Sequence, residues 1–204
     1  MIEKMRAEHI VEIAKIHASS WGSYELSVKL GQEYVKRCLY ASIVACPAAS
    51  AYVSIENGKI AGYCTGIYRL QEFNRYVVRK HTVFLAGAFL KGLLNGRVKV
   101  ADVYDLLRDN KKLKKLQFPE HHLGALALSN EYKKTPRGRE IIVTLIETVM
   151  EDLRNHGCGG IFGAVYDENI AMQKLLLNLG FEQVDTVRYF SKTVLVFEKA
   201  FSGH

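Results

Sequence analysis

The regular succession of apolar strands and helices in the last third of the chain constrains the fold most strongly. Residues 123–128 and 161–165 are short apolar runs with the length of buried strands, and residues 139–156 between them repeat apolar side chains at helical spacing. Because parallel strands need a long crossover, a strand, a helix and a strand in this order predict a βαβ unit. A further helix and two strands follow, over residues 169–179, 184–190 and 193–198.

The first third of the chain predicts a β-hairpin preceded by helices. The dipeptide Asn57-Gly58 lies between two β-rich runs within residues 51–68, and Asn-Gly at such a place is a strong signal for a two-residue hairpin turn. Upstream, a short strand over residues 3–5 leads into a helix that ends near residue 19, and the apolar spacing of residues 26–42 predicts a second helix. The fold class expected from these elements is α+β.

The excess positive charge of the chain is confined to one segment. Between Arg69 and Phe118 there are 12 Lys and Arg against 4 Asp and Glu, a net charge of +8, whereas the other residues hold 16 against 17, a net of −1. We interpret residues 70–118 as a helical insertion within one domain over residues 1–204, with an apolar helix at 84–94 and a basic amphipathic helix at 98–116. Nucleic acid, anionic lipid headgroups and phosphate-bearing ligands are candidate partners, and a solvated helical face is the alternative.

Hydropathy and cysteine usage bear on the cellular compartment. No run of 18 apolar residues is present, and the N-terminal residues lack the apolar core of a signal peptide. The four cysteines are scattered without a Cys-x-x-Cys pair, at Cys38, Cys46, Cys64 and Cys158. We therefore expect a cytoplasmic protein without a disulfide framework and without a zinc or other metal site.

The segment from Leu126 to Arg139 is the most informative for chemistry, because it predicts a strand, a basic loop and a helix start in succession. A helix N-terminus presents unpaired amide groups and positive partial charge, which suit a phosphate. The four cations around it are Lys133, Lys134, Arg137 and Arg139. With Gly138 allowing close approach to the backbone, the segment predicts a pyrophosphate cradle, and a solvated basic loop is the alternative.

Two motifs in this order resemble those of the GNAT superfamily of acyl-CoA-dependent N-acyltransferases. Leu126-Ala-Leu-Ser-Asn-Glu-Tyr132 is similar to the first half of the family's strand-loop-helix element, and Lys133-Lys-Thr-Pro-Arg-Gly138 stands at the second half, with Pro136 in place of the usual first glycine. The second motif matches at Asn169, Leu175, Gly180 and Phe181 and places Met172 where the family has alanine.

The resemblance implies a largely antiparallel mixed central sheet flanked by helices, with the basic insertion between the third and fourth strands. It also implies acetyl-CoA as the acyl donor, bound by backbone of the strand over residues 126–128 and by the helix start that follows. The cofactor-binding residues it implies are Leu126, Ala127, Leu128, Lys133, Lys134, Thr135, Arg137, Gly138, Arg139, Asn169 and Met172.

The catalytic candidates are a base for the amine and an acid for the leaving thiolate. Strand alternation puts His122 on the same face as Leu126 and Leu128, and an imidazole titrates near neutrality, so His122 is the first candidate base. His121 is the second and Glu120 the third. Leu176 occupies the position of the family's usual tyrosine acid, so the remaining candidate acids are Tyr166, Tyr132 and Tyr189, unless the thiolate leaves unaided.

The function expected from this resemblance is direct acetyl transfer from acetyl-CoA to a primary amine of a small molecule, for which the basic insertion suggests an amino sugar or a sugar nucleotide. Two alternatives remain: a catalytically degenerate protein that binds acyl-CoA, and a binder of membrane surfaces or nucleic acid through the insertion. Members of the family are often dimers, and the apolar helix at 84–94 could form a homodimer interface or pack as a buried cap.

Overall fold

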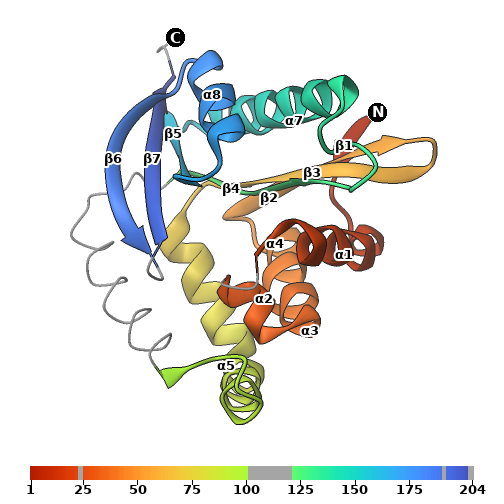
Figure 1. Cartoon of the computed structure of the whole chain (residues 1–204), viewed down its shortest axis with the longest axis vertical. Helices are drawn as coiled ribbons and strands as arrows, with labels where there is room; N and C mark the ends of the chain where they lie inside the picture. Colours follow the sequence, from red (N-terminus) through yellow and green to blue (C-terminus); the bar gives the residue numbers. More distant parts are fainter. Residues whose placement is uncertain (23–24, 101–120, 190–191, 202–204) are drawn as a thin grey trace.

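The computed structural model describes residues 1–22, 25–100, 121–189 and 192–201. They form one seven-stranded sheet in the order β1-β2-β3-β4-β5-β7-β6 (Figure 1). The strands are β1 Ile2–Lys4, β2 Ala49–Glu56, β3 Lys59–Ile67, β4 His122–Leu128, β5 Gly160–Tyr166, β6 Glu182–Tyr189 and β7 Lys192–Ala200. The helices are η1 Ala7–His9, α1 Ile10–Ser20, α2 Leu26–Leu30, α3 Gln32–Tyr34, η2 Val35–Tyr40, α4 Ala41–Ala45, α5 Leu70–Leu94, α7 Pro136–Asn155 and α8 Ile170–Asn178.

The helices cover both faces of the sheet and bury two hydrophobic clusters. Helices α7 and α8 lie on one face, and the helices from α1 to α5 lie on the other (Figure 1). The apolar stripe of α7, including the fully buried Leu145, Ile146 and Val149, packs on β2, β3 and β4. The second cluster joins Ile13 of α1 and Tyr63 of β3 on the opposite face. This two-sided burial confirms the α+β architecture and its largely antiparallel sheet, in which β4 and β5 form the one parallel pair among the described strands.

The hairpin and the C-terminal succession form as predicted. Asn57 and Gly58 both have positive φ, 50° and 74°, which is the conformation that a two-residue hairpin turn requires and that Asn-Gly tolerates. The parallel crossover between β4 and β5 runs through α7, and Gly180 ends the region of α8 with a φ of 79°. The strands extend one or two residues beyond the predicted limits at several ends.

One helix prediction was wrong, and another helix is longer than predicted. Residues 26–42 do not form one helix, because Gly31 adopts a φ of 93° and separates α2 from α3, after which the chain continues through the π-helix η2 into α4. The helix predicted at 84–94 is only the end of α5, which begins at Leu70 and is kinked at His81. The basic helix predicted at 98–116 lies mostly outside the described residues.

The segment after β3 begins with the long helix α5, which leads away from the sheet, as Figure 1 shows. None of the described helices is both long and apolar enough to cross a membrane. The four cysteines are all buried with free thiols.

Candidate active site

The sheet opens between β4 and β5. These strands pair at their N-terminal ends, where His122 lies opposite Phe162 and Leu123 opposite Gly163, and no further pair joins them over the described residues. The chain of β5 is instead held by β7 along its whole length, and that of β4 by β3. Two parallel strands that begin together and then diverge leave a wedge whose walls include backbone amide and carbonyl groups that the neighbouring strand does not pair.

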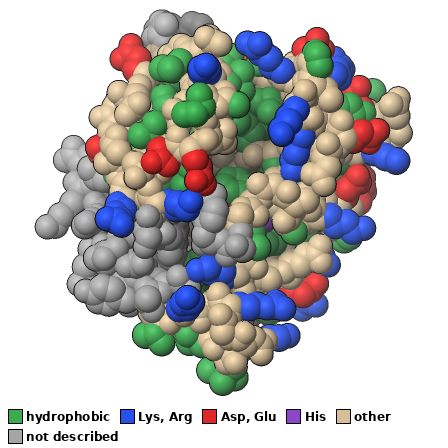
Figure 2. Space-filling view, viewed as in Figure 1, with side chains coloured by type: hydrophobic (Ala, Val, Ile, Leu, Met, Phe, Trp, Pro, Cys, Tyr) green, Lys and Arg blue, Asp and Glu red, His purple; other side chains and the backbone are tan. Residues whose placement is uncertain are grey.

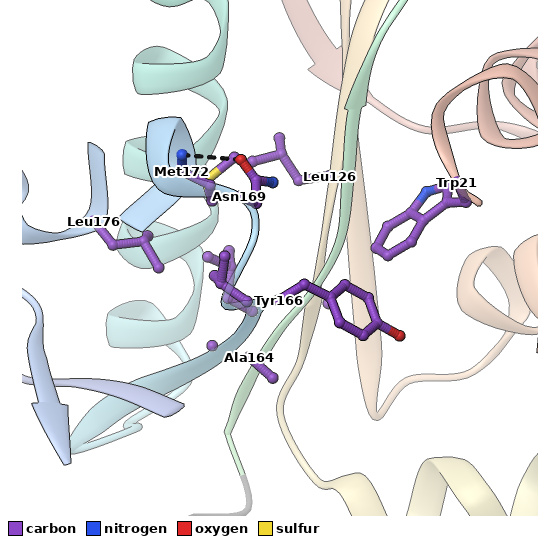
Figure 3. A pocket seen from close by; sticks show the side chains of 11 residues that line it. Trp21, Leu126, Ala164, Tyr166, Asn169, Met172 and Leu176 are labelled. Atoms are coloured by element: carbon purple, nitrogen blue, oxygen red, sulfur yellow. Dashed lines mark hydrogen bonds between the residues drawn. The ribbon is translucent and has the colours of Figure 1, made fainter. Parts of the chain in front are cut away.

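A pocket of about 490 Å³, counting space open to solvent, occupies this wedge. Its lining comes from α1, β4, β5 and α8, as Figure 3 shows: Trp21, Leu123, Gly124, Leu126, Gly163, Ala164, Val165, Tyr166, Asn169, Met172 and Leu176. Met172 and Leu176 lie on one side of β4, whereas Trp21 and the phenol ring of Tyr166 lie toward the other (Figure 3). In the space-filling view this region is a hollow with hydrophobic side chains at its floor, Lys and Arg side chains on its right and Asp and Glu side chains on its lower left (Figure 2). The pocket therefore connects the two faces of the sheet.

The loop after β4 leads directly into α7. Part of the hydrogen-bonding capacity of the free amides at the N-terminus of α7 is used by a side chain of the loop. The Thr135 hydroxyl caps the helix by accepting a hydrogen bond from the Gly138 amide at 2.9 Å, and Pro136 occupies the first helical turn. A Cβ on Gly138 would overlap the carbonyl oxygen of Tyr132 and touch Leu128. The glycine is therefore required for the close packing of the loop on the helix, and its amide is already used by the cap.

The four cations of this loop divide into two pairs. Lys133 donates to the carbonyl oxygen of Ser19 at 3.0 Å and to Asn130 at 2.7 Å, so it ties the loop to α1. Arg137 forms ion pairs with Glu56 at 2.7 Å and Glu140 at 2.8 Å, which raise its pKa. Lys134 and Arg139 are exposed and form no ion pair with another described residue. They are the two exposed cations at this helix start whose charge is not paired with another described residue.

No family model and no curated protein matches the sequence. Solved structures match over nearly its whole length. The polyamine N-acetyltransferase of Drosophila melanogaster gives a TM-score of 0.64 at 14% identity, covering 98% of this chain and 99% of that one. The ribosomal-protein-S18-alanine N-acetyltransferase of Escherichia coli gives 0.59 at 13% identity, covering 100% and 95%. An acetyltransferase assigned to the GNAT family, from Desulfovibrio desulfuricans, gives 0.58 at 9% identity, covering 98% of each chain.

The chain has the GNAT fold. The resemblance inferred from the two sequence motifs is thereby confirmed at the level of the fold. The opening between β4 and β5 adjoins both motifs. Leu126 from the first motif lines the pocket, and so do Asn169 and Met172 from the second. Within the GNAT fold the two segments singled out from the sequence therefore meet at one site.

The second motif forms the α8 side of that site. Asn169 caps α8 by accepting a hydrogen bond from the Met172 amide at 3.2 Å, so its side chain stabilises the start of this helix. Leu176 is almost fully buried and lines the pocket at the position where the sequence lacks a tyrosine. Tyr132 packs partly buried against the core, and the side chain of Tyr189 lies outside the described part of the chain.

The face predicted for His122 was wrong, because β4 contains a bulge. Gly66 pairs with Leu123 and Cys64 with Leu126, so Gly124 and Ala125 of β4 stand opposite the single residue Thr65 of β3. The extra residue reverses the alternation, and Leu123 rather than His122 joins Leu128 in the cluster beneath α7. Strand alternation alone could not reveal this shift.

The two histidines at the start of β4 are held by packing. The His122 ring stacks on Phe162 with 4.5 Å between centroids, and burial lowers its pKa to about 4. His122 is therefore neutral at pH 7 but a weak base. The Nδ1 atom of His121 is 2.6 Å from the carbonyl oxygen of Tyr68. Neither histidine lines the pocket, and Glu120 lies outside the described residues.

Tyr166 does line the pocket, and its partner escaped the sequence analysis. The Tyr166 hydroxyl donates a hydrogen bond of 2.5 Å to the carboxylate of Glu25, the residue just before α2. Burial raises the pKa of Glu25, and the bond from Tyr166 offsets part of that rise. Glu25 and Tyr166 are 141 positions apart, so the sequence near either residue does not indicate the other.

Trp21 packs against a buried network of polar side chains around His17. Trp21 stacks on His17 at 5.4 Å, and the Nδ1 atom of His17 lies 2.8 Å from the hydroxyl of Tyr40. Tyr40 donates to Tyr63 at 2.6 Å, and the Nε2 atom of His17 is 2.9 Å from the hydroxyl of Ser27. Burial lowers the pKa of His17 to about 4, so this histidine is neutral and links α1, η2, β3 and α2 through hydrogen bonds.

Proposed function

We propose that the protein is an N-acetyltransferase that moves an acetyl group from acetyl-CoA to a primary amine by direct attack. The observation that carries the proposal is the pocket between the diverging strands β4 and β5, in a chain with the GNAT fold. Holding the thioester and the amine in one pocket converts a bimolecular reaction into a nearly unimolecular one. Compartment and oligomeric state remain as the sequence predicts them, a cytoplasmic protein that could pair as a homodimer.

The residues at the opening fit the donor in their chemistry. The unpaired edge of β4 at residues 126–128 supplies backbone groups for the amides of a pantetheine arm, and the apolar lining from Met172 and Leu126 suits its alkyl part. Lys134 and Arg139 supply positive charge for the pyrophosphate. Because the Thr135 side chain occupies the Gly138 amide and Pro136 has no N–H, we assign the pyrophosphate to these side chains more than to the helix amides.

This assignment predicts that the affinity for acetyl-CoA depends on two of the four cations of the loop before α7, Lys134 and Arg139. Replacing Lys134 and Arg139 together by Ala should raise the dissociation constant for acetyl-CoA by about a hundredfold, since each charged hydrogen bond contributes roughly 1.5 kcal/mol. Titration calorimetry at fixed ionic strength measures this. Replacing Arg137 alone is the matched control, because its guanidinium is already paired with Glu56 and Glu140. An equal loss from the control would contradict the assignment.

The acceptor class is a small primary amine, with an amino sugar or a sugar nucleotide as the finer expectation from the basic insertion. Helix α5 carries Arg75, Arg79, Lys80 and Lys91 against the single acid Glu72. The solved structures of similar fold include a polyamine N-acetyltransferase and a ribosomal-protein alanine N-acetyltransferase, so cationic amines and an N-terminal α-amine also belong in the screen.

The proposal is tested by incubating the protein with acetyl-CoA and a panel of amines and detecting products by mass spectrometry. The panel contains glucosamine 6-phosphate, an amino-sugar nucleotide, spermidine, agmatine and a peptide with an N-terminal alanine. We expect one class to gain an acetyl group with release of one thiol per product. Binding of acetyl-CoA without any acetylated product would favour the alternative function, a degenerate acyl-CoA-binding protein.

A further inference from the structure

Among the eleven residues that line the pocket, Tyr166 carries the one ionisable side chain. The alternative acid position, Leu176, is apolar, and His121 and His122 lie outside the lining. An amine acceptor must lose protons during acetylation and the leaving thiolate must gain one, so proton transfer needs a group within reach of the pocket. Among the described residues, Tyr166 and its hydrogen-bond partner Glu25 meet this requirement.

Backbone hydrogen bonds fix both members of the pair. The carbonyl oxygen of Tyr166 accepts from the Asn169 amide at 2.9 Å and from the Gln173 side chain at 3.2 Å. The Glu25 amide donates to Gly22 at 3.0 Å, and the Glu25 carbonyl accepts from the Lys29 amide at 3.0 Å. The phenol and the carboxylate are thus held against each other from two different elements, β5 and the start of α2.

The carboxylate does not serve the helix that follows it. Glu25 stands at the N-cap of α2, yet its side chain makes no capping hydrogen bond and instead reaches across to Tyr166. Burial raises its pKa above the usual 4.5, and the Tyr166 bond is the one opposing cause. Burial and the Tyr166 hydrogen bond are the causes of this shift. The other ionisable groups on the elements around Glu25 include His17, Lys29, Tyr34, Lys36, Arg37, Arg75, Lys80 and His81.

We infer that Glu25 and Tyr166 form a proton-transfer pair for the amine, an inference that rests on the proposed acetyl transfer. The acceptor's ammonium group first releases one proton to solvent. As the nitrogen bonds to the acetyl carbon, it loses a second proton to the Glu25 carboxylate. The carbon–sulfur bond then breaks with its electron pair on sulfur, and the sulfur takes the phenolic proton of Tyr166. Glu25, now a carboxylic acid, returns its proton to the Tyr166 oxygen, which restores both groups.

The hydrogen bond between the two side chains explains the order of these transfers. While Glu25 is a carboxylate, the phenol donates to it and its proton is held away from the thiolate. Once Glu25 is protonated it becomes the donor, the bond reverses, and the phenolic proton is free for the sulfur. The pair thus couples loss of the nitrogen proton to release of the thiol, and the negative charge of Glu25 selects a cationic amine.

The test compares Glu25→Gln, Tyr166→Phe and the double variant with the wild type, using spermidine and agmatine as acceptors. Each single variant should lower kcat about a hundredfold or more, the usual scale of acid–base catalysis. The double variant should be no more than about threefold slower than the singles, because the two groups act as one unit. Glu33→Gln is the matched control, since Glu33 is exposed and pairs only with Lys36 and Arg37 among the described residues.

Two further readouts separate the pair from a structural role. The rate of the wild type should rise with pH as Glu25 ionises, with a midpoint above pH 4.5 because the pKa of Glu25 is raised. The Glu25→Gln variant should show no such rise. The thermal shift by acetyl-CoA should be unchanged in both single variants. Single variants within about threefold of the wild type, or wild type that binds acetyl-CoA and acetylates neither amine, would overturn the inference. Absence of any acetyl-CoA shift in the wild type would overturn the proposed function instead.

Discussion

Replacing Ala164 by Phe is expected to abolish the stabilisation of the protein by acetyl-CoA. Ala164 is exposed on β5 within the opening, and its small side chain leaves the pocket free (Figure 3). A benzyl group at this place would fill the space between the strands. A ligand at a hundredfold its dissociation constant stabilises a protein by about 2.7 kcal/mol, so complete loss of this gain means an affinity reduced at least a hundredfold.

The ligand-free fold should tolerate this change. Ala164 is paired with Val196 of β7, and Phe is favoured in strands, so the unfolding midpoint without ligand should move by only a few degrees. Ala164→Ser is the control that keeps the pocket open and should retain the whole acetyl-CoA shift. If the Phe variant kept the shift as well, the donor would bind somewhere other than the opening between β4 and β5.

Replacing Gly138 by Ala is expected to destabilise the fold by on the order of 2 kcal/mol or more, because the new methyl group would overlap the backbone carbonyl of Tyr132. A backbone atom cannot move aside as a flexible side chain can, so the loop must shift away from α7. For a chain of this size such a loss lowers the unfolding midpoint by roughly 2–4 °C per kcal/mol. The same shift should weaken acetyl-CoA binding, since Lys134 lies on this loop.

The same substitution at Gly87, Gly87→Ala, should raise the free energy of unfolding, whereas Gly138→Ala should lower it. Gly87 lies inside α5, and a Cβ there would meet nothing within 4 Å. Alanine in place of an exposed helical glycine stabilises by roughly 0.5–1 kcal/mol. Thermal unfolding of both variants measures the contrast. A Gly138→Ala protein as stable as the wild type would mean that the loop does not need its close packing on the helix.

The sequence predicted the elements whose signals are local. The Asn57-Gly58 turn, the strands and the long helix α7 depend on neighbouring residues and on apolar spacing. Gly31 shows the limit of that reasoning, because the apolar spacing continues through the break and only the positive φ of this glycine reveals it.

The site was predictable in part for the same reason. Each of the two motifs is one continuous stretch of sequence. The loop before α7 and the start of α8 could therefore be placed around a donor site. The pair formed by Glu25 and Tyr166 joins residues 141 positions apart, and nothing near either residue indicates the other. The bulge that turns His122 to the other face depends on how β3 and β4 align, which a single strand does not encode.

The central claim is that the opening between β4 and β5 binds acetyl-CoA, and thermal unfolding of the wild type tests it most directly. The protein is heated without ligand, with CoA and with acetyl-CoA, each near a hundredfold its dissociation constant. We predict a midpoint raised by roughly 5–10 °C with acetyl-CoA, from a stabilisation of about 2.7 kcal/mol. An unchanged midpoint at millimolar acetyl-CoA would contradict this prediction, because a chain with the GNAT fold would then have lost its donor site.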